Sequence, residues 1–165
     1  MSIEDVKTYL KAWGKDTSVM EFDVPCATVE QAAKATGVEE ARIAKTLSFN
    51  TRTTNIEKGA RSCILLVAAG DARIDGKKFK DCFGVKSKML SPEEAFLLTG
   101  HAVGGVCPFA VNNPDAAIYL DISLKRFATV FPACGSSNSV MELSCDELYE
   151  ITKARAWVDV CKNWS

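Results

Sequence analysis

Two features of the sequence combine residue types that could carry out chemistry. Lys45 lies in the apolar run I-A-K-T-L (residues 43–47), where a lysine either reaches the surface or points its ammonium into a cavity. The second feature is the loop G-G-V-C-P, formed by Gly104, Gly105, Val106, Cys107 and Pro108. Adjacent glycines permit close backbone approach and positive φ angles, so this loop could turn successive N–H groups toward an anion or oxyanion. The same residues also suit a tight turn.

Other candidates for catalysis are few. His101 is the only histidine, so any Ser–His or Cys–His mechanism must use it, with Cys107 as the nearest thiol. A lone histidine beside a glycine-rich loop is also typical of a structural residue. In the polar turn C-G-S-S-N-S (residues 134–139), Ser136 and Ser137 could line a pocket or simply close a hairpin.

The cysteines indicate free thiols rather than metal chemistry. Seven cysteines are scattered along the chain without a C-x-x-C pair. Because a structural zinc site needs clustered Cys and His ligands, we expect no metal and no cofactor. Reduced, buried thiols in a cytoplasmic protein are the simplest interpretation.

The charge balance argues against a general affinity for polyanions but permits a local basic patch. The net charge is −1, which gives no overall attraction to nucleic acid. Residues 73–88 are nevertheless rich in basic side chains, among them Lys77, Lys78 and Lys80. These lysines form either a solvated helix face or a patch that binds a phosphate backbone, and both interpretations stay open.

Capping signals and hydrophobic periodicity predict a mixture of helices and strands in one domain, residues 1–165. Helices are expected over residues 2–12, 28–37, 39–45, 75–82 and 91–99, and again from 144 onward. Strands are expected over residues 46–50, 61–69, 85–89, 117–120, 128–133, 139–143 and 156–161. The irregular order favours an α+β (mixed α/β) fold over a doubly wound one. With no leader peptide or membrane-spanning segment in the sequence, we expect no membrane association.

The order and spacing of these motifs resemble one family throughout residues 20 to 160. The shared runs are T-V-E-Q-A-A (28–33), I-A-K-T-L (43–47), G-D-A-R-I-D (70–75) with K-K-F (77–79), S-P-E-E-A (91–95), T-G-H-A-V-G-G-V-C-P-F (99–109), A-A-I-Y-L-D (116–121) and S-C-D-E-L (144–148). Together they are similar to the YbaK/prolyl-tRNA synthetase-associated editing domains.

That resemblance implies a fold, an activity and a site. The fold would be a partly barrel-like mixed β-sheet surrounded by helices. The activity would be hydrolysis of the ester of a mischarged aminoacyl-tRNA, in trans and without a metal. Lys45 would be the essential lysine of the family, and Gly104 and Pro108 would end its G-x-x-x-P loop. The partner would be the acceptor end of aminoacyl-tRNA, with prolyl-tRNA synthetase as a further candidate, and a monomer is expected.

Roles for the remaining residues follow as hypotheses. The backbone N–H groups of residues 104–107 would hold the ester carbonyl, and Lys45 would position the substrate rather than act as a base. His101, Ser136 and Ser137 would line a pocket for a small amino acid, with alanine favoured over cysteine, serine or threonine, on tRNA-Pro. Lys77, Lys78 and Lys80 would contact the tRNA. The alternative is a non-catalytic module of the same fold that binds tRNA or a synthetase.

Overall fold

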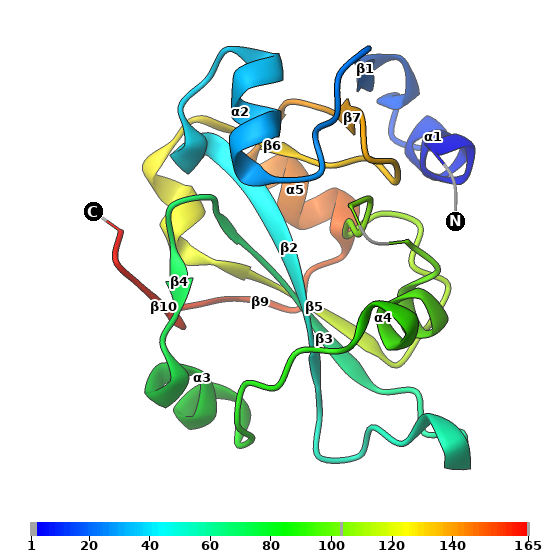
Figure 1. Ribbon diagram of the computed structural model, residues 1–165, viewed down its shortest axis with the longest axis vertical. Coiled ribbons are helices and arrows are strands. Elements are labelled where there is room, and N and C mark those ends of the chain that lie inside the picture. The colour runs from blue at the N-terminus through cyan, green and yellow to red at the C-terminus, as the bar shows by residue number, and fades with distance from the viewer. Residues whose placement is uncertain (1–2, 103, 165) are drawn as a thin grey trace.

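The computed structural model describes residues 3–102 and 104–164. Ser2, the first residue of the helix expected over residues 2–12, and Val103, in the glycine-rich run, lie outside these residues. A six-stranded mixed sheet, ordered β8-β6-β2-β3-β5-β9, curls through the centre of the molecule (Figure 1). Its strands are β2 (Ile43–Asn50), β3 (Cys63–Ala69), β5 (Ala116–Asp121), β6 (Thr129–Pro132), β8 (Leu143–Ser144) and β9 (Ala156–Val158). Two-stranded ladders join β1 (Met20–Glu21) to β7 (Ser139–Val140), and β4 (Arg73–Ile74) to β10 (Cys161–Lys162).

Helices surround this sheet, and local signals set most of their ends. The α-helices are α1 (Ile3–Lys11), α2 (Val29–Thr36), α3 (Gly76–Phe83), α4 (Pro92–Thr99) and α5 (Cys145–Thr152). Short 3-10 helices are η1 (Asp16–Ser18), η2 (Glu40–Arg42), η3 (Ile56–Lys58) and η4 (Ile122–Arg126). Capping boxes open α2, α4 and α5, because a Ser or Thr and the Gln or Glu three residues later satisfy each other's backbone N–H groups. The mixed α+β fold predicted from the sequence is therefore confirmed.

The central strand β3 anchors the core. Every residue of its run C-I-L-L-V-A-A is buried, as expected for a strand covered on both faces. It pairs antiparallel with β2 and parallel with β5. This fixed central ladder holds β2, which carries Lys45, in a defined register.

The two faces of β2 point to different parts of the molecule, because successive side chains on a strand alternate. Lys45 shares a face with Phe49, whose ring packs on Phe79 of α3 with centroids 4.7 Å apart. Lys45 therefore lies on the α3 side of β2. Thr46 and Ser48 point to the opposite side.

The expected helical stretch over residues 39–45 is wrong in its second half. A 3-10 turn, η2, occupies its start, and β2 already begins at Ile43. There the strand pairs with Phe131 of β6. Local periodicity contains no information about a partner so distant in the sequence, so the helical pattern yields to tertiary pairing.

Three expected strands also differ from the structure. Residues 85–89 contribute only one bridge, between Met89 and Phe49. Residues 139–143 divide between β7 and β8, and residues 156–161 divide between β9 and β10. The two parts of each divided stretch pair with strands of different ladders. A continuous apolar pattern does not reveal this change of partner.

No helix among the described residues is long and apolar enough to cross a membrane.

Candidate active site

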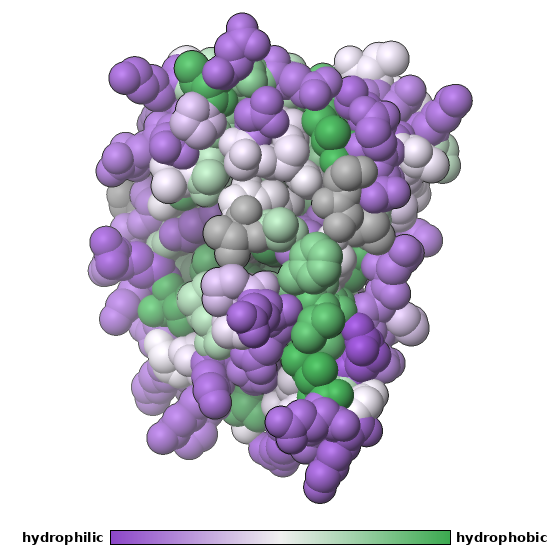
Figure 2. Space-filling model, turned by 45° about the vertical axis from the view of Figure 1, so that its right-hand side comes forward, coloured by the Kyte–Doolittle hydropathy of each residue, from purple (hydrophilic) through white to green (hydrophobic). Residues whose placement is uncertain are grey.

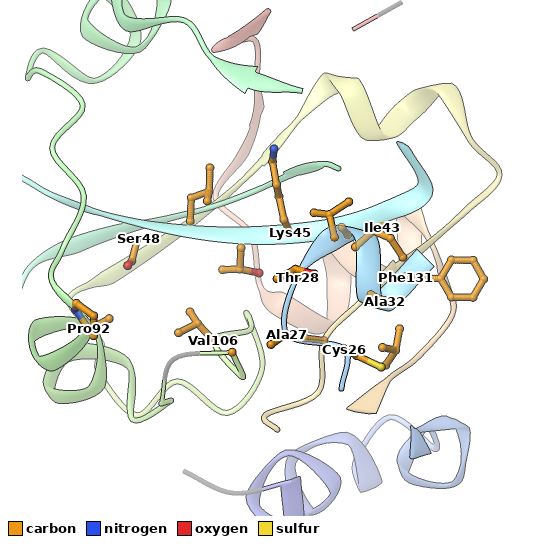
Figure 3. Close-up of a pocket in the computed structure, with 18 of the residues that line it drawn as sticks. Cys26, Ala27, Thr28, Ala32, Ile43, Lys45, Ser48, Pro92, Val106 and Phe131 are labelled. Carbon is orange, nitrogen blue, oxygen red and sulfur yellow. The ribbon is translucent and has the colours of Figure 1, made fainter. Parts of the chain in front are cut away.

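A pocket of about 550 Å³ opens beside β2, a size typical of small-molecule sites. Its walls come from β2, the start of α2, the start of α4, the strands β6 and β7, and the glycine-rich loop. Figure 3 shows Cys26, Ala27, Thr28 and Val106 gathered on one side of β2. The pocket brings Lys45 and two residues of the glycine-rich loop, Gly104 and Val106, to one place.

Lys45 contributes to the pocket wall, but its ammonium points to the other side of β2 from Thr28 and Val106 (Figure 3). Its Nζ donates hydrogen bonds to the carbonyl oxygens of Gly70, at 3.3 Å, and of Ala72. An ammonium has three N–H donors, so two of them are used within the β3–β4 turn. Among residues 3–102 and 104–164, no protein acceptor takes the third N–H.

Burial is the main cause that lowers the pKa of Lys45, and Arg73 adds to this effect. Asp71 acts in the opposite direction. The Asp71 carboxylate is itself held by Arg126 through contacts of 2.6 and 2.9 Å. A half-buried lysine within this network has a fixed position, unlike a lysine that reaches freely into water.

The β3–β4 turn can approach Lys45 because of one glycine. A Cβ atom on Gly70 would lie 2.1 Å from the carbonyl oxygen of Glu40, a distance that no side chain can occupy. The missing side chain lets the turn lie against η2 and present its carbonyl to Lys45. The run G-D-A-R-I-D thus positions the lysine ammonium.

The glycine-rich loop divides into a part that faces the pocket and a part that supports it. Gly104 and Val106 line the pocket. Gly105 is buried and donates its N–H to the carbonyl of Ala102 at 3.0 Å, so this N–H is already used. Cys107 is fully buried behind the loop.

Pro108, the last residue of the predicted motif, also lies away from the pocket. It is buried and lines a separate cavity of about 260 Å³ near Tyr9 and Arg155. Pro108 therefore fixes the exit of the loop through its restricted backbone rather than by contact with a ligand in the first pocket.

The structure places His101 in the core instead of the pocket wall. Its side chain is completely buried, and its Nε2 lies 2.7 Å from the carbonyl oxygen of Phe109 and 3.5 Å from the sulfur of Cys107. Burial lowers the pKa of His101 and raises the pKa of the Cys107 thiol to about 12. A neutral imidazole beside an un-ionised, inaccessible thiol is a structural pair, unlike an activated Cys–His dyad.

Ser136 and Ser137 lie behind the loop and do not line the first pocket. The hydroxyl of Ser136 is bonded within its own turn, to Asn138 at 2.9 Å and Ser139 at 2.6 Å. The turn touches the loop closely: a Cβ on Gly104 would lie 3.5 Å from the Cβ of Ser137. In this structure the serine turn supports the glycine loop.

The predicted tRNA-binding lysines lie on and around the exposed surface of α3. Lys77, Lys78 and Lys80 are all exposed. Lys78 is committed to the protein, with its Nζ 3.0 Å from Asp159 and 3.1 Å from the carbonyl of Cys161. Lys77 and Lys80 remain the better candidates for contact with a polyanion.

Several wall residues were not singled out from the sequence. Cys26, Ala27 and Thr28 line the pocket at the start of α2, and Phe131, Ala133 and Val140 line it from β6 and β7. The capping signal at Thr28 predicts that a helix begins there. It does not predict which part of the protein the first turn of that helix faces. The residues of β6 and β7 reach the pocket only through the order of strands in the sheet.

The surface near α4 is partly apolar. Figure 2 shows hydrophobic residues in a strip on the face that carries α4, where Phe96 and Leu97 are half exposed. Met89, at the pocket wall, is exposed to a similar degree.

Among residues 3–102 and 104–164, no group of His, Cys, Asp and Glu could hold a metal ion.

Comparison with known proteins identifies the family. The family model of the aminoacyl-tRNA editing domain matches residues 23–151. The chain belongs to the aminoacyl-tRNA editing domain family. The match includes Lys45 and residues 104–108, and the resemblance noted in the sequence is thereby confirmed.

Three similar proteins match nearly the whole length of this chain. The uncharacterized protein YwhH of Bacillus subtilis (strain 168) is 51% identical over 164 residues and covers 99% of both chains. A crystal structure provisionally described as a trans-editing enzyme for prolyl tRNA synthetase has a TM-score of 0.82 at 30% identity, covering 97% of this chain and 96% of that one. The hypothetical protein APE2540 has a TM-score of 0.80 at 29% identity, covering 96% of this chain and 99% of its own.

Proposed function

We propose that this editing domain hydrolyses the ester bond of mischarged aminoacyl-tRNA in trans. One observation carries the proposal: a pocket bordered by both Lys45 and the loop residues Gly104 and Val106, in a chain of the editing family. In the reaction, water adds to the acyl carbon and the C–O bond to the ribose breaks. The amino acid leaves as a carboxylic acid that ionises, and the ribose oxygen takes up a proton.

The glycine loop is proposed to stabilise the negative charge that develops on the acyl oxygen. The N–H of Gly105 is engaged by Ala102, which leaves Gly104 and Val106, the two residues that line the pocket, as the sources of donors. Removing one such donor typically lowers the rate by about 10²–10³. A preformed loop can therefore replace much of a catalytic triad.

Lys45 is proposed to hold the 3′-terminal nucleotide. Its ammonium lies on the same side of β2 as α3, which carries Lys77 and Lys80. A phosphate backbone that runs along α3 would meet the remaining N–H of Lys45 before the acyl group enters the pocket. Lys45 then positions the substrate and neutralises the charge of its phosphate. The nucleophile is water, oriented with help from the ribose 2′-hydroxyl.

For the amino acid we propose a small side chain, with alanine on tRNA-Pro favoured over cysteine, serine or threonine. The pocket wall contains apolar side chains such as Ile43, Phe131 and Val140. A substrate hydroxyl placed against this apolar part of the wall is not satisfied, and this costs binding free energy. A synthetase pocket distinguishes one methylene by only about 1–3 kcal/mol, so small amino acids escape it and need this second check.

The test is to replace the ammonium while keeping the shape of the side chain. Lys45→Met should abolish deacylation of Ala-tRNA-Pro, since methionine keeps an unbranched chain without charge or donors. Lys45→Arg, with a differently shaped cation, should retain only part of the activity. Lys58→Met, an exposed lysine in the loop between β2 and β3, is the matched control and should behave as wild type.

Two results would count against this assignment. Folded Lys45→Met protein with wild-type turnover would remove Lys45 from the reaction. If wild-type protein binds charged tRNA but releases no amino acid from a panel of aminoacyl-tRNAs, the chain is a binding module of the editing fold instead of a deacylase.

A further inference from the structure

The pocket lies where the central sheet separates at one edge of β2. The ladder between β2 and β6 ends with the pair Ala44 and Pro132. Further along the same edge, the N–H of Leu90 donates to the carbonyl of Ser48 at 3.0 Å. Thr46 is the residue midway between these two contacts, and all of residues 44–48 line the pocket.

The register of the sheet determines where the backbone of Thr46 points. The N–H of Asn50 donates to the carbonyl of Lys88 at 2.8 Å, so the backbone groups of Ser48 and Asn50 face away from β3. In an antiparallel ladder the hydrogen-bonding direction alternates from residue to residue. The N–H and C=O of Thr46 therefore also face away from β3, into the gap.

On this edge of β2, the stretch without a paired strand is as long as one residue of a β-ladder. Among the described residues, no strand pairs with β2 at Thr46 on this side. Leu90 and Ala133 border the gap at its two ends, and both line the pocket. The result is one adjacent donor and acceptor in an otherwise mainly apolar wall.

We propose that the backbone of Thr46 binds the aminoacyl group of the substrate as a single residue of β-pairing. The C=O of Thr46 accepts a hydrogen bond from the α-ammonium, and its N–H donates to the acyl carbonyl oxygen. An aminoacyl ester carries these two groups on either side of one Cα, as a residue does when it exchanges both hydrogen bonds across an antiparallel pair. This inference rests on the proposed deacylase function.

The pairing explains how the pocket can hold a substrate whose side chain is small. The recognised groups are common to all amino acids, so the anchoring is independent of the side chain. Because both hydrogen bonds fix the Cα, only one enantiomer directs its side chain to the same wall of the pocket. L- and D-aminoacyl esters should therefore be hydrolysed at different rates.

The experiment compares Thr46→Pro with Thr46→Val. Proline removes the N–H, and the β2–β3 ladder does not use this N–H, so the strand can tolerate it. Valine keeps the backbone groups and the branched shape but removes the hydroxyl. Thr46→Val is therefore the reference for the loss of the side-chain hydroxyl alone. We expect kcat/KM for Ala-tRNA-Pro to be on the order of 10²-fold lower in Thr46→Pro than in Thr46→Val, with both variants folded by circular dichroism.

A second measurement changes the substrate and leaves the protein intact. Propionyl-tRNA-Pro, the analogue of Ala-tRNA-Pro without the α-amino group, lacks this donor altogether and adds no bulk, and wild-type protein should hydrolyse it on the order of 10- to 100-fold more slowly than Ala-tRNA-Pro. This measurement decides the matter if Thr46→Pro fails to fold. Equal rates for the two substrates would overturn the inference.

The possible failures are distinguishable. If Thr46→Pro is folded and as active as Thr46→Val and wild type, the backbone pairing is wrong while the deacylase function stands. If wild-type protein hydrolyses neither substrate nor any other aminoacyl-tRNA, the proposed function itself fails.

Discussion

Gly105 determines how closely the glycine-rich loop packs against the serine turn. A Cβ atom added there would lie 2.9 Å from the carbonyl carbon of Gly135 and 3.0 Å from the backbone nitrogen of Ser136. Both are backbone atoms, so no side-chain rotation can relieve the contact. In a Gly105→Ala variant the loop and the turn must move apart.

The size of the effect follows from that displacement. Overpacking of this kind typically costs about 1–3 kcal/mol, and for a chain of this length each kcal/mol lowers Tm by roughly 2–4 °C. Gly104 and Val106 flank Gly105 and line the pocket, so the shift also moves the proposed donors. Since a misplacement of about 1 Å can cost 10²-fold in rate, we expect kcat/KM for deacylation to fall about 10- to 100-fold.

The assay measures amino acid release and thermal unfolding on the same preparations. Gly76→Ala is the matched control, because a Cβ at Gly76 meets nothing within 4 Å and should leave both quantities near wild type. Wild-type kcat/KM together with wild-type Tm in Gly105→Ala would refute the packing argument. A lowered Tm with unchanged kinetics would refute the catalytic role of the loop position.

Two further predictions concern His101 and α3. Burial lowers the pKa of His101 below its ordinary value of 6.5. Below that pH, the unfolded chain therefore binds more protons than the folded protein does. The free energy of unfolding should fall as pH drops from 7 to 5.5, by at most about 1.4 kcal/mol per pH unit. Urea titrations at several pH values should show a flatter profile for His101→Gln, and equal slopes would contradict the assignment. The double change Lys77→Ala with Lys80→Ala should raise KM for charged tRNA several-fold and reduce the salt dependence of KM at unchanged kcat. Lys58→Ala is the control. An unchanged KM would favour the interpretation that these lysines only form a solvated face of α3.

Local interactions explain what the sequence determined about this fold. The capping boxes of α2, α4 and α5 join residues three positions apart, so their signals are complete within a short window. The buried run of β3 and the family motifs are readable in the same way. These features were sufficient to predict the mixed fold and the editing family, and to direct attention to Lys45 and the glycine-rich loop, whose roles remain predictions.

Only the tertiary structure decided how these parts meet. Whether Lys45 reaches water or a cavity depends on the carbonyls of Gly70 and Ala72, which a separate turn supplies. His101 turns into the core because the carbonyl of Phe109 accepts its hydrogen bond there. The gap at Thr46 exists because β6 leaves β2 after Ala44. All three depend on contacts between separate segments of the chain, and these contacts form only when the sheet is assembled.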